Sequence, residues 1–99
     1  MPEGSTETGA PVVEREFEIL NRLGLHARAA AQFVHLANRF ASEIRISKDG
    51  VEVNGKSIMG VLMLAAPRES RILVRAVGPD AEEAISAIGE LIGRKFGEE

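Results

Sequence analysis

The spacing of apolar side chains along the chain predicts four strands and three helices. Alternation of apolar and polar positions is typical of a half-buried strand, and recurrence at intervals of three and four residues is typical of a helix packed on a core. Alternation occurs over residues 13–19, 43–47, 51–53 and 71–77, and helical spacing occurs over residues 27–40, 58–65 and 81–92. The element order that follows is βαββαβα.

Turn and capping residues separate these elements. Asp49-Gly50 lies between the second and third strands, where a hairpin turn needs residues that accept a positive φ. Ser57 is placed to cap the second helix, and Pro67 ends it. Asp80, with Glu83 three residues later, predicts a variant of the capping box at the start of the last helix.

This order predicts an α+β fold, a two-layer open-faced sandwich with a four-stranded antiparallel sheet and the helices on one face. The hairpin makes the sheet at least partly antiparallel. The apolar stripes of the helices must be buried, and one sheet face is the surface available to them. The other face would be in water, and the charged residues expected there are Glu14, Glu16, Glu18, Glu43, Arg45, Glu52, Arg71 and Arg75.

The first residues differ in composition from the rest of the chain. Residues 1–11 read MPEGSTETGAP, which offers almost nothing to bury. We therefore expect a disordered tail over residues 1–12 and one domain over residues 13–99, since 99 residues suffice for a single core.

Composition excludes several classes of function. The chain has no cysteine and only two histidines, so we expect no disulfide, no metal site and no cofactor. The net charge of −3 and the four aromatic residues argue against nucleic-acid binding. The longest apolar stretch, residues 58–67, is too short to span a membrane, and the N-terminus lacks the apolar core of a signal peptide. A monomeric cytoplasmic protein is expected.

The sharpest chemical feature is the segment Gly24-Leu25-His26-Ala27-Arg28, where a histidine stands at the entry to a helix. The first N–H groups of a helix lack internal partners and, with the helix dipole, favour an anion. The guanidinium of Arg28 offers a planar fork of donors that suits phosphate oxygens. The residues alone leave two interpretations open: His26 is a nucleophile for a phosphoryl group, or it is a surface or capping residue. His35, on a polar part of the same helix, is expected to be exposed and without a phosphoryl role.

Two segments of the chain resemble the signatures of HPr, the phosphocarrier of the bacterial phosphoenolpyruvate-dependent phosphotransferase system. Residues 21–30, NRLGLHARAA, resemble its active-site segment, and residues 53–62, VNGKSIMGVL, resemble its second signature. The resemblance implies that enzyme I phosphorylates His26 on Nδ1 with phosphate from phosphoenolpyruvate, and that Arg28 lies beside that phosphate. It implies an enzyme IIA protein as the acceptor.

The resemblance also implies a regulatory site and a docking surface. Ser57 matches the serine that HPr kinase/phosphorylase modifies in many bacteria. The apolar side chains of Ile58, Met59 and Leu62 match the surface on which partners dock. Such a protein is a carrier and a substrate of its partners, not an enzyme.

The chain departs from the family pattern at two positions. Ala29 stands where the family usually has proline, and Leu23 stands where sugar-type HPr often has Asn or Ser. Residues 21–24 look more like the nitrogen-related branch, whereas the context of Ser57 is intact. The alternative function is therefore a regulatory binding module of the same fold, switched by phosphorylation of Ser57, in a nitrogen-related phosphotransfer system.

Overall fold

The structure, a computed structural model, describes residues 9–98 of the chain and contains every predicted element. The strands are β1 (Val12–Glu18), β2 (Glu43–Lys48), β3 (Val51–Asn54) and β4 (Arg71–Val77). The helices are α1 (Ala27–Ala37), α2 (Ile58–Met63) and α3 (Ala81–Gly93), followed by a short 3-10 turn η1 (Lys95–Gly97). Among residues 9–98, no helix is long and apolar enough to cross a membrane.

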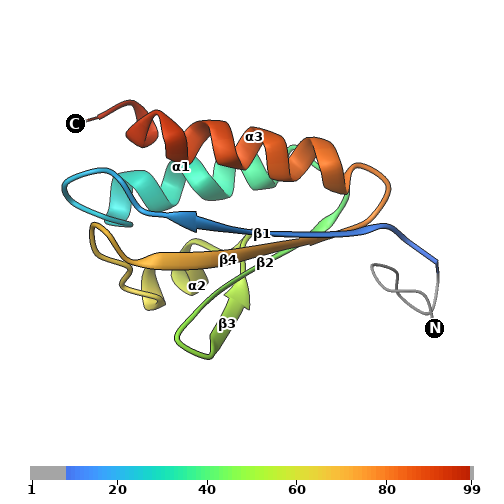
Figure 1. Cartoon of the computed structure of the whole chain (residues 1–99), viewed down its shortest axis with the longest axis horizontal. Coiled ribbons are helices and arrows are strands. Elements are labelled where there is room, and N and C mark those ends of the chain that lie inside the picture. Colours follow the sequence, from blue (N-terminus) through green and yellow to red (C-terminus); the bar gives the residue numbers. More distant parts are fainter. Residues whose placement is uncertain (1–8, 99) are drawn as a thin grey trace.

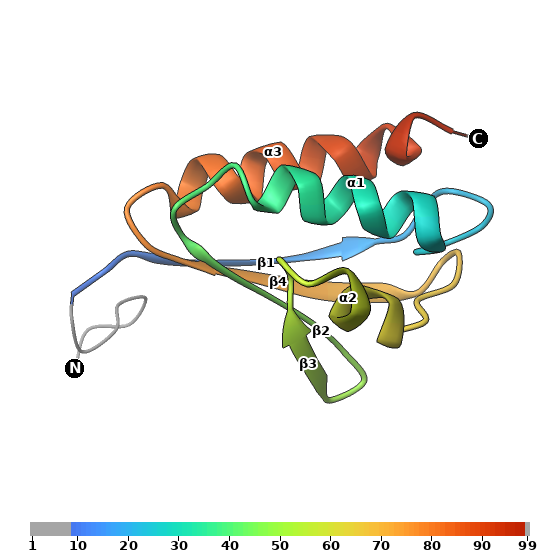
Figure 2. The same cartoon turned by 180° about the vertical axis from the view of Figure 1, so that it is seen from behind.

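The four strands form one antiparallel sheet in the order β1-β4-β2-β3. β4 is therefore central, with Phe17 of β1 opposite Ile72 and Ile46 of β2 opposite Val74. Helices α1 and α3 lie side by side over one face of the sheet, while α2 packs beside α1 and contacts β3 (Figures 1 and 2). The predicted α+β open-faced sandwich is confirmed.

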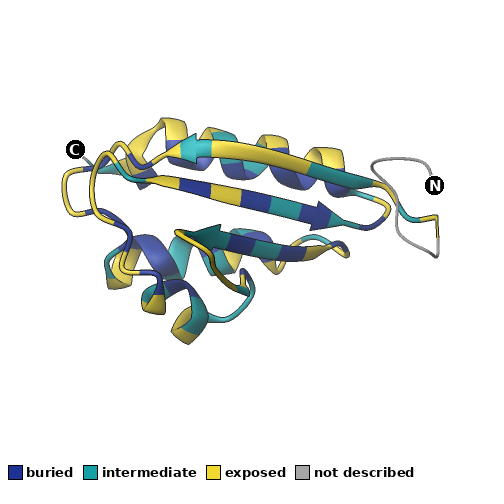
Figure 3. Cartoon of the chain, turned by 60° about the horizontal axis from the view of Figure 1, so that its bottom comes forward, coloured by how far each residue is buried: buried dark blue, intermediate teal, exposed yellow. Residues whose placement is uncertain are grey.

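The core lies between the helices and the inner face of the sheet. Ile44, Ile46, Ile72, Val74 and Ala76 are buried, and they alternate with more exposed residues, as the colours along β4 show (Figure 3). The outer face carries the predicted charges, and three pairs of opposite charge cross between strands. These are Glu16–Arg71 at 3.1 Å, Arg45–Glu52 at 2.9 Å and Glu14–Arg75 at 3.6 Å. Exposed pairs of this kind add little stability, so the buried face decides the register.

A glycine sets the distance between α3 and the sheet edge. A Cβ atom added at Gly89 would lie 2.9 Å from Cε1 of Phe17, closer than side-chain atoms normally approach. Gly89 thus allows α3 to lie directly on the half-buried ring of Phe17. This contact fixes the path along which α3 returns over β1.

The ends of several elements differ slightly from the predicted ones. Helix α1 ends at Ala37 and α2 ends at Met63, each before the end that the apolar spacing indicates. β1 begins at Val12, and the Pro11 carbonyl accepts a bond of 2.9 Å from Gly78 N. The last part of the predicted tail is therefore paired with the domain, while residues 1–8 lie outside the described residues.

The predicted capping box at Asp80 is wrong. Asp80 occupies the N-cap position of α3, but its side chain makes no capping bond there. Its carboxylate accepts hydrogen bonds from Ala41 N and Ser42 N, each at 2.9 Å, and from the Ser42 hydroxyl. Ser42 also packs closely on Gly78, where an added Cβ would lie 2.6 Å from Ser42 Oγ. The α1–β2 turn thus presents its free N–H groups to Asp80.

These bonds lower the pKa of Asp80 below its ordinary value of 3.8, with the Ser42 hydroxyl as the largest cause. A lowered pKa means that Asp80 stabilises the fold fully above its ordinary value and loses this contribution as pH falls through the lower, folded value. We expect Asp80→Asn to lower the urea midpoint of unfolding by a similar amount from pH 5 to pH 8, with the difference shrinking in strong acid.

The matched control is Asp49→Asn, at an exposed hairpin position whose side chain pairs with Lys48 at the surface. This control should leave the midpoint almost unchanged. Equal midpoints for Asp80→Asn and the wild type near neutral pH would contradict the assigned role of Asp80.

Candidate functional site

The loop between β1 and α1 is held by the loop between α2 and β4. Ile19 N donates to Ser70 O and Leu25 N donates to Ala66 O, each at 2.9 Å. Gly24 has φ +68°, and a Cβ added there would lie 2.4 Å from the Ala66 oxygen. Only glycine combines this left-handed backbone with so close an approach. The backbone leading to His26 is therefore fixed from both sides.

His26 is the N-cap residue of α1, with an extended backbone at φ −73° and ψ −179°. Its side chain makes no capping bond, and the first backbone bond of the helix runs from Ala30 N to the His26 carbonyl. The N–H groups of residues 27–29 precede this bond and, with the positive end of the helix dipole, favour an anion beside the ring.

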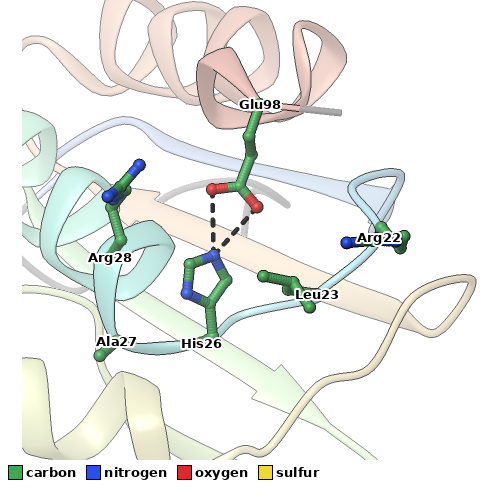
Figure 4. A pocket seen from close by; sticks show the side chains of 6 residues that line it. All are labelled: Arg22, Leu23, His26, Ala27, Arg28 and Glu98. Carbon is green, nitrogen blue, oxygen red and sulfur yellow. Dashed lines mark hydrogen bonds and ion pairs between the residues drawn. The ribbon is translucent and has the colours of Figure 1, made fainter.

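The ring of His26 lies in an open pocket of about 530 Å³ at this end of the molecule (Figure 4). The pocket is lined by Arg22, Leu23, His26, Ala27, Arg28 and Glu98. The side chain of His26 is 28% exposed, so a second protein can reach it. Arg28 rises from the first turn of α1, on the side of the ring nitrogen that Glu98 does not contact. The structure thus brings His26 and Arg28 to one pocket, as the sequence predicts.

Glu98 is a site residue that the sequence analysis missed. Its carboxylate contacts Nε2 of His26 at 2.9 Å through Oε1 and 3.0 Å through Oε2. The amide of Asn21 donates a second bond of 2.9 Å to Oε1. The pKa of Glu98 is lowered from its ordinary value of 4.5, first by the bond from Asn21 and then by the bond from His26, with a smaller contribution from the charge of Arg28. Glu98 is therefore ionised at neutral pH.

Asn21 connects the two ends of the site. It is fully buried, and its Nδ2 donates both to Glu98 and, at 2.7 Å, to the Gly24 carbonyl. Its Oδ1 has no hydrogen-bond partner among the described residues. Asn21 and Glu98 are 77 positions apart, and no periodicity joins them. The one available signal was Asn21 itself, the polar first residue of the active-site segment.

Ser57 and the apolar residues that follow it lie on α2, outside the pocket lining. Ser57 is the N-cap of α2, where its Oγ accepts a bond of 3.2 Å from Gly60 N, as predicted. Ile58 and Met59 are exposed. Leu62 is half-buried and packs against the core, and Met63 is instead exposed at 72%. The exposed apolar surface of α2 therefore consists of Ile58, Met59 and Met63.

His35 is exposed and lies outside the pocket around His26. Within residues 9–98, only one of the two histidines, His26, stands at a helix start and beside a carboxylate. The position of His26 at the start of α1 therefore distinguishes the candidate nucleophile from His35.

Comparison with known proteins agrees with this geometry. Residues 13–94 match the family described as the phosphorylation site of the HPr component of the phosphotransferase system. The chain is 46% identical to phosphocarrier protein HPr of Cupriavidus necator over 87 residues, which cover 88% of this chain and 98% of that protein. It is 49% identical over 77 residues to the HPr-like protein Crh of Halalkalibacterium halodurans, covering 78% and 92% of the two chains.

Solved structures show the same fold at similar identity. The crystal structure of HPr-C-His from Thermoanaerobacter tengcongensis aligns with a TM-score of 0.85 at 48% identity, over 88% of this chain and 98% of that one. HPr from Bacillus anthracis aligns with a TM-score of 0.79 at 44% identity, over 82% and 96%. On its fold, its histidine at the start of α1 and these matches, the chain belongs to the HPr family of phosphocarrier proteins.

Proposed function

We propose that His26 is the residue of this phosphocarrier that takes the phosphoryl group. The observation that carries this proposal is the position of its ring, at the start of α1 and in an open pocket shared with Arg28. By analogy with the family, the donor is enzyme I, phosphorylated by phosphoenolpyruvate, and the acceptor is an enzyme IIA protein. The proposed compartment is the cytoplasm.

The transfer needs a neutral imidazole and a means of holding the anion. The lone pair on Nδ1 attacks phosphorus, a P–N bond forms, and the bond between phosphorus and the donor breaks with its electron pair left on the donor. The N–H groups of residues 27–29 and the guanidinium of Arg28 then stabilise the phosphoryl oxygens. The reverse steps deliver the group to the acceptor.

The chain then acts as a substrate of its partners and not as an enzyme. A carrier must meet two proteins in turn, so its contacts with each are small and transient. An open pocket suits this requirement, and a monomer presents it to both partners. A crystal structure of an HPr dimer from Thermoanaerobacter tengcongensis is also similar, with 49% identity and a TM-score of 0.71.

Ser57 is the proposed regulatory site. The proposed docking surface is that of Ile58, Met59 and the half-buried Leu62, to which the structure adds the exposed Met63. A phosphate on Ser57 would add a charge of about −1.5 to −2 beside these apolar side chains. This charge opposes docking through desolvation and through repulsion of an acidic partner. HPr kinase/phosphorylase is the enzyme that the family resemblance implies.

The alternative is a regulatory module of the same fold that is switched at Ser57 and carries no phosphate on His26. The observation in its favour is the likeness to a protein named HPr-like, Crh of Halalkalibacterium halodurans. The shared pocket of His26 and Arg28 favours the carrier, because a module switched only at Ser57 has no need of an anion site at α1.

His26→Ala tests the choice between these functions. We expect the variant to lose all acid-labile labelling by enzyme I and phosphoenolpyruvate, with a melting temperature close to that of the wild type, because the ring is partly exposed and outside the core. The control is His35→Ala, which removes the exposed histidine and should be labelled normally. Undiminished labelling of His26→Ala would exclude His26 as the acceptor.

Arg28→Lys tests the role of the guanidinium. Lysine keeps the charge but loses the forked geometry, so transfer to and from His26 should slow by about tenfold, the equivalent of about 1.4 kcal/mol. The measurement is the rate of phosphoryl transfer in both directions, with Arg22→Lys in the same pocket as the control. Wild-type rates for Arg28→Lys would remove Arg28 from the mechanism.

Ser57→Asp tests the proposed regulation. Aspartate caps helices as well as serine does, so the thermal melt should be unchanged while transfer from enzyme I slows. Ser57→Ala is the matched control, since it loses the cap, at a cost of about 0.5–2 kcal/mol, without adding charge. Slower transfer in the alanine variant than in the aspartate variant would show that the cap, not the charge, matters.

A further inference from the structure

The last residues of the described chain form a hook that returns to the active site. We call residues 94–98 the C-terminal hook. Lys95 and Phe96 both adopt left-handed backbone, with φ values of 58° and 57°, and this reverses the chain after α3. The ring of Phe96 is buried in the core, and its carbonyl accepts a bond of 2.9 Å from Gln32 Nε2 on α1. The hook thereby places Glu98 over His26 (Figure 4).

The contact between Glu98 and His26 specifies which ring nitrogen carries the proton. Both carboxylate oxygens lie within 3.0 Å of Nε2. An ionised carboxylate only accepts hydrogen bonds, so Nε2 must be the donor. In a neutral imidazole with a proton on Nε2, the free lone pair is on Nδ1.

The carboxylate itself is fixed by a buried partner. Asn21 donates to Oε1 of Glu98 at 2.9 Å and is held in turn by the Gly24 carbonyl at 2.7 Å. Glu98 is therefore not a mobile terminal side chain that happens to lie near the ring. The family match ends at residue 94, the first residue of the hook, so the match itself does not extend to Glu98.

We propose that Glu98 is a positioning residue that directs the phosphoryl group to Nδ1 of His26 and excludes it from Nε2. This inference rests on the proposed function, in which His26 is the phosphoryl acceptor. Two effects of the carboxylate act together. It holds the proton on Nε2, which leaves Nδ1 as the nucleophile, and its negative charge repels a phosphoryl group that approaches Nε2.

The same contact serves the phosphorylated ring. When Nδ1 bonds to phosphorus, its lone pair is used, and the ring with its Nε2–H becomes cationic. Glu98 then faces a positive ring as an ion-pair partner, while the phosphoryl oxygens face α1 and Arg28. When the P–N bond breaks, its electron pair returns to Nδ1, and Nε2 keeps its proton throughout. Glu98 itself neither gains nor loses a proton.

Chemical phosphorylation of the full chain with potassium phosphoramidate tests the proposal without any partner protein. Attack by a ring nitrogen forms the new P–N bond and releases ammonia, and NMR of protein labelled with ¹⁵N-histidine distinguishes the Nδ1 adduct from the Nε2 adduct. In the wild type, His26 should form the Nδ1 adduct alone. In Glu98→Ala the ratio of Nδ1 to Nε2 adduct should fall by about tenfold or more, because a charge-assisted hydrogen bond is lost.

Three controls make this test specific. Glu98→Gln offers a neutral oxygen that still accepts the Nε2 proton but lacks the charge, so its ratio of Nδ1 to Nε2 adduct should lie between those of the wild type and Glu98→Ala. Glu90→Ala removes an exposed carboxylate from the neighbouring end of α3 and should behave like the wild type. His35 is exposed and pairs with no acidic side chain within residues 9–98, so its product ratio should be the same in every variant.

The outcomes separate the inference from the function on which it rests. An Nδ1 adduct alone in a folded Glu98→Ala protein, or an Nε2 adduct on wild-type His26, would overturn the role of Glu98 and leave the carrier function intact. A wild-type protein that takes no phosphate on His26 from enzyme I would overturn the carrier function itself.

Discussion

β4 is hydrogen-bonded along both of its edges, to β1 on one side and to β2 on the other. The end of β1 and the beginning of β4 must therefore meet, as Glu18 and Arg71 do, and the loops attached to them lie side by side. α3 starts at the opposite end of β4 and runs back. Its 13 residues span about 20 Å, against about 24 Å for the seven residues of β4, so it ends above the same loops. The site lies where the β1–α1 loop, the α2–β4 loop and the end of α3 converge (Figures 1 and 2).

The negative charge of Glu98 has partners in both the free and the proposed phosphorylated protein. In the free protein, Glu98 is balanced by the amide of Asn21, the ring N–H of His26 and the nearby charge of Arg28. In the proposed phosphorylated state, the cationic ring faces Glu98, and the phosphoryl group faces Arg28 and the start of α1. Acceptance of the group thus requires no large rearrangement, which suits a carrier that must release what it takes.

The fold could be predicted because the local pattern of apolar and polar residues agrees with the tertiary structure. Alternation in β2 and β4 and the apolar stripes of α1 and α3 are consequences of one buried face, and they are legible without any long-range information. The roles of His26 and Arg28 could also be predicted from the sequence, because a helix start is a local feature. Glu98 could not be predicted in this way. It reaches the site because Lys95 and Phe96 adopt left-handed backbone after α3, a conformation that their residue types do not favour. The prediction for the Asp80 side chain failed for a related reason. Its carboxylate bonds to the turn around Ser42, 38 residues away, instead of capping its own helix.

Two free-energy contributions of similar size and opposite sign act on the hook. Left-handed backbone at a non-glycine residue costs about 1–2 kcal/mol, and both Lys95 and Phe96 adopt it. Burial of the Phe96 ring offsets this by about 1.5–3 kcal/mol. Neither term dominates, so the hydrogen bonds from Gln32, Asn21 and His26 decide where the hook lies.

One of these bonds comes from the ring that changes its charge when it is phosphorylated. Coupling between two groups is reciprocal: if Glu98 stabilises a cationic phosphorylated ring, that ring stabilises the hook by the same free energy. The hook is therefore more firmly held in the loaded carrier than in the free one. The hook, which contributes no strand to the sheet, thereby becomes coupled to the chemical state of the active site.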